Sequence, residues 1–138
     1  MNYLIDTNVL SELRRPQPHP SVLAWFEKHP KRTLYLSVLT LGEIRKGINK
    51  LPSGPRREAL DNWLEQELPM YFSGRLLTLD AATADTWGQL CARVQRPLPA
   101  IDGLLAATAL QHHMSLVTRN TRDFEGLGLN VVNPWPLA

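Results

Sequence analysis

The chain has 138 residues, 43% of them hydrophobic and 20% charged, with a net charge of +2; these values are typical of one globular domain, expected here over residues 1–138, and unlike those of disordered or fibrous chains. The apolar runs are too short for a membrane-spanning helix and the first residues lack a basic start, so we expect neither a transmembrane segment nor a signal peptide. Cys91 is the only cysteine, which excludes an internal disulfide and favours a reducing, cytoplasmic location.

Apolar runs and helical periodicity alternate along the first half of the chain. Residues 1–6 are apolar and end in Asp, which predicts a buried strand, and Ser21 is expected to cap a helix that follows three prolines. The elements expected in this half are a strand at 1–6, helices at 7–13 and 21–29, a strand at 33–37, and helices at 38–50 and 55–69.

The second half continues the alternation, with strands at 76–79, 115–118 and 130–132, helices from Asp80 and over 100–113, and a helical turn at 122–125. Trp87, Leu90, Cys91 and Val94 recur at helical spacing, so they are expected to face the core, and this placement would explain Cys91 without chemistry. The alternation predicts an α/β fold of right-handed βαβ units, with a parallel sheet of about five strands and helices on both faces. Such sheets bind ligands at the carboxyl ends of their strands, where the strand order reverses.

Four acidic residues fall at this edge of the predicted sheet: Asp6, Glu43, Asp102 and Asp123. Each has a structural alternative. Asp6 could cap the next helix, and residues 40–43 could form a capping box, although a helix that begins near Ser37 would place Glu43 a turn too deep for this. Asp102 could complement a helix dipole, and Asp123 could be a surface acid.

Four such coincidences at one edge are less probable than one site. Clustered carboxylates repel each other and persist when hard cations neutralise them, and an all-oxygen set suits Mg²⁺ or Mn²⁺ rather than Zn²⁺. Thr118 and Asn120 add neutral oxygens for hydrogen bonds around the carboxylates. His19, His29, His112 and His113 lack metal-ligand spacing, and we interpret them as non-catalytic; Walker A, GxGxxG, GxSxG and CxxC sequences are absent.

Charge is strongly segregated along the chain. Residues 14–57 contain ten Lys/Arg and two acids, net +8, whereas the remainder contains five Lys/Arg and eleven acids, net −6. A basic segment beside an acidic remainder fits a surface that meets phosphates next to a cation site, although solvated helix faces would give the same count. The candidates for phosphate contact are Arg14, Arg15, Lys46, Arg56 and Arg57.

At these residues the chain resembles the PIN-domain family, and within it the VapC-type toxins, especially the FitB-like or plasmid-stability subgroup. The likeness covers essentially the whole chain. Its blocks are residues 4–12 (LIDTNVLSE), 37–43 (SVLTLGE) with Gly47, 102–109 (DGLLAATA), and 118–120 (TRN) with Asp123 and Phe124. The first and last blocks are specific, and no acidic position of the family pattern is missing.

The resemblance implies a Mg²⁺- or Mn²⁺-dependent endoribonuclease that is the toxin of a type II toxin–antitoxin pair. Asp6, Glu43 and Asp102 would be the principal metal ligands, Asp123 would complete the site, and Thr7, Thr118 and Asn120 would orient water or carboxylates. The partners implied are RNA, a small antitoxin with a DNA-binding end, and a second copy of the chain. Apolar residues on the helix at 55–68 also favour a homodimer.

Other functions remain open on the sequence. A haloacid-dehalogenase-like phosphatase needs an acid two residues after Asp6, where this chain has Asn8, and a receiver domain needs an acidic pair and a late Lys. A DNA flap nuclease needs room for an additional clamp. The main alternative is a non-catalytic partner of a DNA-binding antitoxin in an operator-binding repressor complex.

Overall fold

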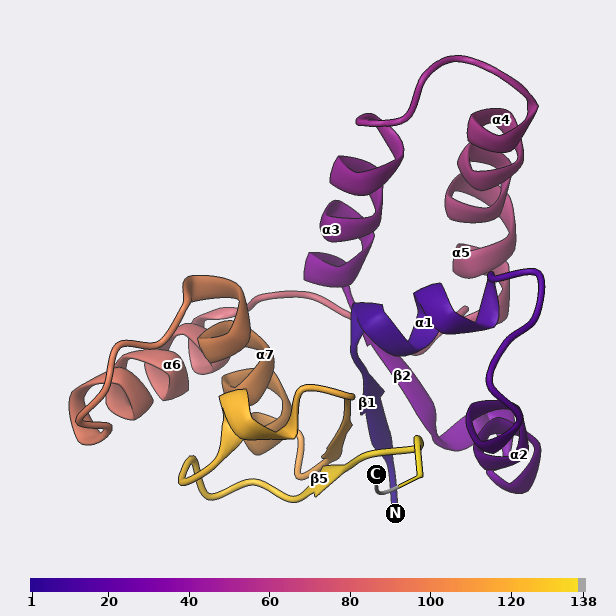
Figure 1. The fold of residues 1–138 in the computed structure, drawn as a ribbon. Helices are drawn as coiled ribbons and strands as arrows, with labels where there is room; N and C mark the ends of the chain where they lie inside the picture. Colours follow the sequence, from indigo (N-terminus) through magenta and orange to yellow (C-terminus); the bar gives the residue numbers. More distant parts are fainter. Residues whose placement is uncertain (137–138) are drawn as a thin grey trace.

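The computed structural model describes residues 1–136 and shows a parallel five-stranded sheet (Figure 1). Its strand order is β3-β2-β1-β4-β5, and every neighbouring pair is parallel. The strands are β1 (Tyr3–Ile5), β2 (Leu34–Ser37), β3 (Leu76–Leu77), β4 (Ser115–Val117) and β5 (Val131–Val132). The predicted α/β fold with a parallel sheet is confirmed, and all five strands are shorter than expected.

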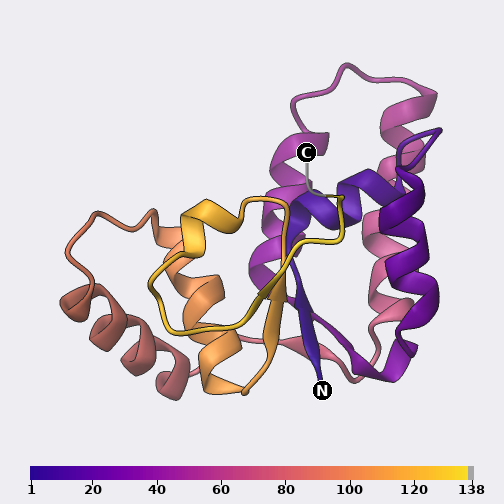
Figure 2. The same cartoon turned by 60° about the horizontal axis from the view of Figure 1, so that its bottom comes forward.

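Helices cover both faces of the sheet. They are α1 (Thr7–Leu13), α2 (Pro20–Lys28), α3 (Val38–Ile48), α4 (Pro55–Asn62), α5 (Leu68–Tyr71), α6 (Ala81–Arg93) and α7 (Ala100–Gln111), with short 3₁₀ segments η1 (Lys31–Thr33) and η3 (Thr121–Phe124) and a π-turn η2 (Trp63–Glu67). Figures 1 and 2 both show α6 and α7 on one side of the strands and α1 to α5 on the other.

Alternate strand residues divide between two hydrophobic cores, because successive side chains of a strand point to opposite faces. Ile5 and Val117 pack with α1 to α5, whereas their neighbours Leu4 and Leu116 pack with α6 and α7. The central strands β1, β2 and β4 are mostly apolar, which is typical of parallel sheets covered on both faces. The two cores hold the sheet firmly beneath its carboxyl edge.

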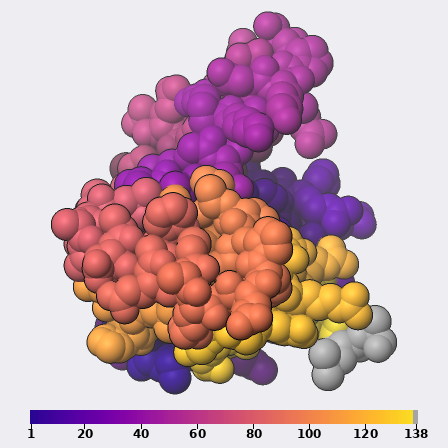
Figure 3. Space-filling model, turned by 90° about the vertical axis from the view of Figure 1, so that its left-hand side faces the viewer, coloured from indigo at the N-terminus to yellow at the C-terminus, as the bar shows by residue number. Residues whose placement is uncertain are grey.

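Helices α3 and α4 form an arm that extends beyond the sheet. Arg45 on α3 donates hydrogen bonds to Asp61 (2.6 Å) and Glu65 (2.8 Å) across the arm. Figure 3 shows the arm standing above the face formed by α6 and α7. The arm therefore forms a wall beside the carboxyl ends of β1 and β2.

Two expectations about helix residues are wrong. The cap of α2 is His19 rather than Ser21: Pro20 occupies the first turn, and His19 Nδ1 accepts a hydrogen bond from the Ser21 amide at 3.1 Å. Cys91 is exposed, although Leu90 beside it is buried. Consecutive helical residues point about 100° apart, so the packed stripe of α6 includes Leu90 and leaves Cys91 on the outer side.

The helix expected to end at Pro69 continues to Tyr71 through the π-turn. A proline inside a helix clashes with the preceding turn, and a widened π-turn relieves that clash. Trp63, Leu64 and Leu68 on this segment are buried in the core. Most of the apolar surface of these three side chains is therefore used within the core, and the homodimer stays a prediction. Within residues 1–136, no helix has the length and apolar character needed to cross a membrane.

Candidate functional site

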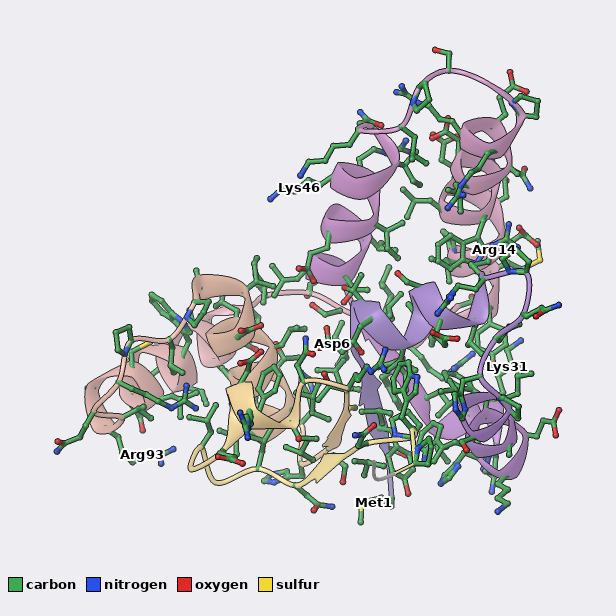
Figure 4. The ribbon with its side chains drawn as sticks, in the orientation of Figure 1. Met1, Asp6, Arg14, Lys31, Lys46 and Arg93 are labelled. Atoms are coloured by element: carbon green, nitrogen blue, oxygen red, sulfur yellow. The ribbon has the colours of Figure 1, made fainter. Side chains whose placement is uncertain are left out.

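The strand order reverses between β1 and β4, because the chain moves outward from β1 to β3 and then returns to the other side of β1. This is the position at which parallel sheets bind ligands. Asp6 follows β1 and Thr118 follows β4, and the Thr118 hydroxyl donates a hydrogen bond to Asp6 Oδ2 at 2.8 Å. Asp6 therefore stands at the centre of the carboxyl edge (Figure 4).

Asp6 is buried, with 7% of its surface exposed. Its Oδ1 accepts a hydrogen bond from the Thr7 amide at 2.7 Å, so the residue does cap α1. Burial is the main reason that the pKa of Asp6 is raised; hydrogen bonds from Thr118 and Thr7 oppose the shift, and the charges of Glu43 and Asp123 add to it. An ordinary cap has no carboxylate neighbours of this kind, so capping alone does not account for the environment.

Glu43 does not form a capping box. The N-cap of α3 is Ser37, whose Oγ accepts a hydrogen bond from the Leu39 amide at 3.1 Å. Glu43 is therefore too far along the helix to reach its free amides. Its Oε1 instead accepts a hydrogen bond from the Thr7 hydroxyl at 2.7 Å, which joins α3 to the start of α1.

The other two acids approach from the opposite side of the edge. Asp102 lies in the first turn of α7, and Asp123 is exposed on η3. The pKa of Asp102 is raised, mainly by burial and then by the charges of Asp123, Asp6 and Glu43, while Arg96 acts in the opposite direction. Each of the four predicted acids thus lies within electrostatic reach of at least two of the others.

The carboxylates suit a hydrated divalent ion better than a closed metal cage. Within residues 1–136, no three His, Cys, Asp or Glu side chains are close enough to hold one ion by themselves. A structural zinc site needs four such ligands. Mg²⁺ instead keeps several waters and is held through one or two carboxylates and the phosphates of a substrate, which is consistent with four oxygen-rich side chains that repel each other.

Neutral side chains position these carboxylates. Thr7 bonds to Glu43 and Thr118 bonds to Asp6, as the sequence suggested, whereas Asn120 contributes its backbone amide, which donates to Thr118 Oγ1 at 3.1 Å. Asn8 was missed as a site residue. Its Nδ2 lies 3.3 Å from Asp6 Oδ2 and 3.2 Å from Thr118 Oγ1, and its Oδ1 accepts a hydrogen bond from the Arg119 amide at 3.1 Å. The available signal was a polar residue two positions after Asp6.

A cleft of about 630 Å³ runs between α1, α3 and α4 and has Thr7 and Glu43 in its lining. Arg14, Arg15 and Arg56 also line it. Arg57 instead donates a hydrogen bond to the Leu51 carbonyl at 3.1 Å, and Figure 4 shows Lys46 pointing away from α4 on the outer side of α3. Three of the five predicted basic residues therefore come together beside the carboxylates.

Comparison with known proteins identifies the family of the chain. The PIN domain family matches residues 3–128. The VapC ribonuclease Y4jK of Sinorhizobium fredii is 38% identical over 98% of this chain and 99% of its own, and Toxin FitB of Neisseria gonorrhoeae is 38% identical over 96% and 97%. The solved structure of FitAB bound to an IR36 DNA fragment has a TM-score of 0.90 and 37% identity, and the match covers 99% of this chain and 97% of that one. The chain therefore belongs to the PIN domain family and is of the VapC type.

Proposed function

We propose that the protein is a metal-dependent endoribonuclease that hydrolyses RNA phosphodiesters and acts as the toxin of a type II toxin–antitoxin pair. The observation that carries this proposal is the convergence of Asp6, Glu43, Asp102 and Asp123. Burial is the main reason that the pKa values of Asp6 and Asp102 are raised, and the charges of the neighbouring carboxylates add to the rise. The names of the relatives, a VapC ribonuclease and a FitB toxin, support the reaction and the biological role.

The four carboxylates would hold Mg²⁺ or Mn²⁺ together with water. Asp6, Glu43 and Asp102 are the principal ligands, one or two of them binding directly and the rest through water, and Asp123 acts directly or through water. Divalent ions of this kind supply a more acidic water as nucleophile and offset charge on the attacking and leaving oxygens. The residues of the chain orient this site. Thr118 and Asn8 hold Asp6 Oδ2, and Thr7 holds Glu43, so the carboxylate oxygens are aimed before substrate arrives.

The basic cleft would guide the RNA. Its arginines, Arg14, Arg15 and Arg56, line the same cleft as Glu43, so they can attract phosphates toward an acidic site that would otherwise repel them. Lys46 lies on the outer side of α3, where it would contact the RNA strand outside the cleft. Arg57 is held by a backbone carbonyl, which makes it the weakest of the five candidates.

The proposed protein partners are an antitoxin that binds operator DNA and a second copy of the chain, in the cytoplasm. The DNA-bound FitAB structure supports the first partner. A second cavity, of about 290 Å³ and lined mainly by apolar residues of α1, α2 and the η2–α5 segment, provides the kind of surface that a protein partner covers. Light scattering at micromolar concentration should give the mass of a dimer, and a monomeric mass would refute the second partner.

The test is cleavage of a mixed RNA pool by the purified chain with Mg²⁺, with Mn²⁺, and with EDTA. We expect metal-dependent internal cuts that EDTA stops and that Asp102→Asn abolishes. A chain that folds and forms an operator-binding complex with its antitoxin but cuts no RNA under these conditions would establish the non-catalytic role instead.

A further inference from the structure

Two arginines, one at the end of α6 and one in the loop after it, donate hydrogen bonds to the segment that carries Asp123. Arg93, the last residue of α6, donates a hydrogen bond from Nη2 to the Leu127 carbonyl at 3.1 Å. Arg96 lies in the loop that leads into α7, and its Nη2 donates to the carbonyls of Asp123 (3.0 Å) and Glu125 (2.9 Å). These contacts join residues 27 to 34 positions apart in the sequence.

Asp123 has little else to hold it. It is exposed and lies in a single 3₁₀ turn of four residues that has no side-chain cap. Within residues 1–136, its carboxylate accepts none of the hydrogen bonds found, unlike Asp6 and Glu43, which neighbouring hydroxyl groups hold. The buried ring of Phe124, 2% exposed, anchors the turn from below but leaves its outer backbone to other contacts.

Arg96 also sits where the turn meets the helix that bears Asp102. The loop that contains it ends at Ala100, the first residue of α7, and Asp102 follows in the first turn. A guanidinium fixed to the Asp123 peptide therefore links the two carboxylates through one short loop. Its planar, pre-organised donors lose less freedom per hydrogen bond than a lysine would.

We propose that Arg96 is a positioning residue for the carboxylate site: by holding the backbone of Asp123 and Glu125 against the loop before α7, it keeps Asp123 at a fixed place relative to Asp102. The inference rests on the proposed function, because it concerns the same site. It assigns a task to an exposed arginine outside the basic cleft.

A purely electrostatic role for Arg96 predicts the opposite result. Its positive charge lies near Asp102, where it counteracts the rise in the pKa of that carboxyl. If charge were its whole contribution, removing it would make the site more negative and tighten the binding of Mg²⁺. If Arg96 positions Asp123, removing it loosens one oxygen donor and weakens binding. The sign of the change separates the two.

The experiment measures Mg²⁺ affinity by calorimetry on the full chain, alongside hydrogen exchange of the metal-free protein. We expect Arg96→Ala to weaken Mg²⁺ binding by about tenfold, at the lower end of the effect of lost outer contacts at metal sites. Exchange should accelerate at the Asp123 and Glu125 amides, which bond within the turn to Asn120 and Arg122. Arg96 is exposed, so its truncation removes no core packing.

Arg93→Ala is the matched control, because it also removes one bond to a carbonyl of the same segment. Figure 4 shows Arg93 at the outer end of α6, away from Asp6, so its loss should leave Mg²⁺ affinity at the wild-type value. A double-mutant cycle completes the test: if Arg96 acts through Asp123, Arg96→Ala should add no further loss in an Asp123→Asn background.

Unchanged or tighter Mg²⁺ binding by Arg96→Ala, or losses that add fully to those of Asp123→Asn, would overturn the inference while leaving the proposed function intact. An absence of Mg²⁺ binding in the wild-type chain would instead overturn the proposed function, and the inference with it.

Discussion

Asp6 and Glu12 are buried carboxylates at opposite ends of α1, with 7% and 6% of their surfaces exposed. The groups around these two carboxylates differ in charge. Glu12 accepts hydrogen bonds from the His19 amide (2.9 Å) and from Arg15 (3.2 Å), and the His19 amide is the main reason that its pKa is lowered. Asp6 has two carboxylates among its neighbours, and its pKa is raised, mainly by burial.

The difference shows that burial alone does not identify a functional acid. Glu12 is surrounded by donors that satisfy its charge, so it stabilises the fold by holding the proline-rich connection between α1 and α2. Asp6 keeps a charge that its surroundings leave partly uncompensated, which costs stability unless a cation is supplied. Perturbed acids of the second kind are the ones that mark candidate sites.

The largest expected effect is that of Asp6→Asn. Asparagine keeps the cap but removes one charge and one good ligand, so RNA cleavage should fall by about a hundredfold or more, at least as much as for the loss of an outer contact at a metal site. The metal-free variant should melt at the same temperature as wild type or higher. Its stabilisation by Mg²⁺ should shrink, since a ligand stabilises the folded state less when it binds that state more weakly. If Asp6→Asn keeps full cleavage activity and the same stabilisation by Mg²⁺, Asp6 serves only as the N-cap of α1.

Glu12→Gln should give the reverse pattern. Glutamine loses the charge that attracts Arg15 and weakens the bond from the His19 amide, so unfolding free energy should fall by about 1 kcal/mol, the typical net worth of a hydrogen bond. Cleavage per folded molecule, measured well below the melting temperature, should remain close to wild type. If Glu12→Gln keeps its stability but loses cleavage, Glu12 belongs to the site and the distinction between Glu12 and Asp6 is wrong.

The pH dependence of unfolding in urea should separate the two acids without any metal. The folded pKa of Asp6 lies above its usual 3.8, so the stability that wild type has at low pH is lost as the pH rises through that folded pKa, and the advantage of Asp6→Asn grows over the same range. The folded pKa of Glu12 lies below its usual 4.5, so the disadvantage of Glu12→Gln is complete above pH 4.5 and disappears as the pH falls. Parallel curves would mean that the two environments are alike.

The smallest expected effect is on the salt dependence of RNA binding. Arg15 pairs with Glu12 at the end of α1 and also lines the basic cleft. If the cleft binds phosphates, replacing its three arginines, Arg14, Arg15 and Arg56, with alanine should flatten the slope of log affinity against log salt by roughly 0.7 to 1 per true contact. Arg57→Ala is the control, because Arg57 is bonded to a carbonyl and does not line the cleft. RNA binding by an inactive Asp6→Asn chain over a salt series measures both; equal slopes would exclude the cleft as the binding path.

Local patterns in the sequence predicted the succession of strands and helices along the chain. They also placed all four acids at one edge of the sheet. This succeeded because apolar runs, prolines and caps act over a few residues, and because parallel strands must share their carboxyl edge. The location of the Glu43 helix start near Ser37 also followed from an apolar run, and the structure bears it out.

The tertiary structure decided what no local pattern contains. Cys91 and Leu90 are adjacent in a helical stripe, and only the position of α7 determines which of them is buried. The role of Asn8 depends on β4 lying next to β1, which brings Thr118 and Arg119 within hydrogen-bond distance across 110 residues. The tertiary structure also determines the neighbours of each buried acid. Glu12 lies beside hydrogen-bond donors and Asp6 lies beside other carboxylates, because charge interactions act through space and not along the chain.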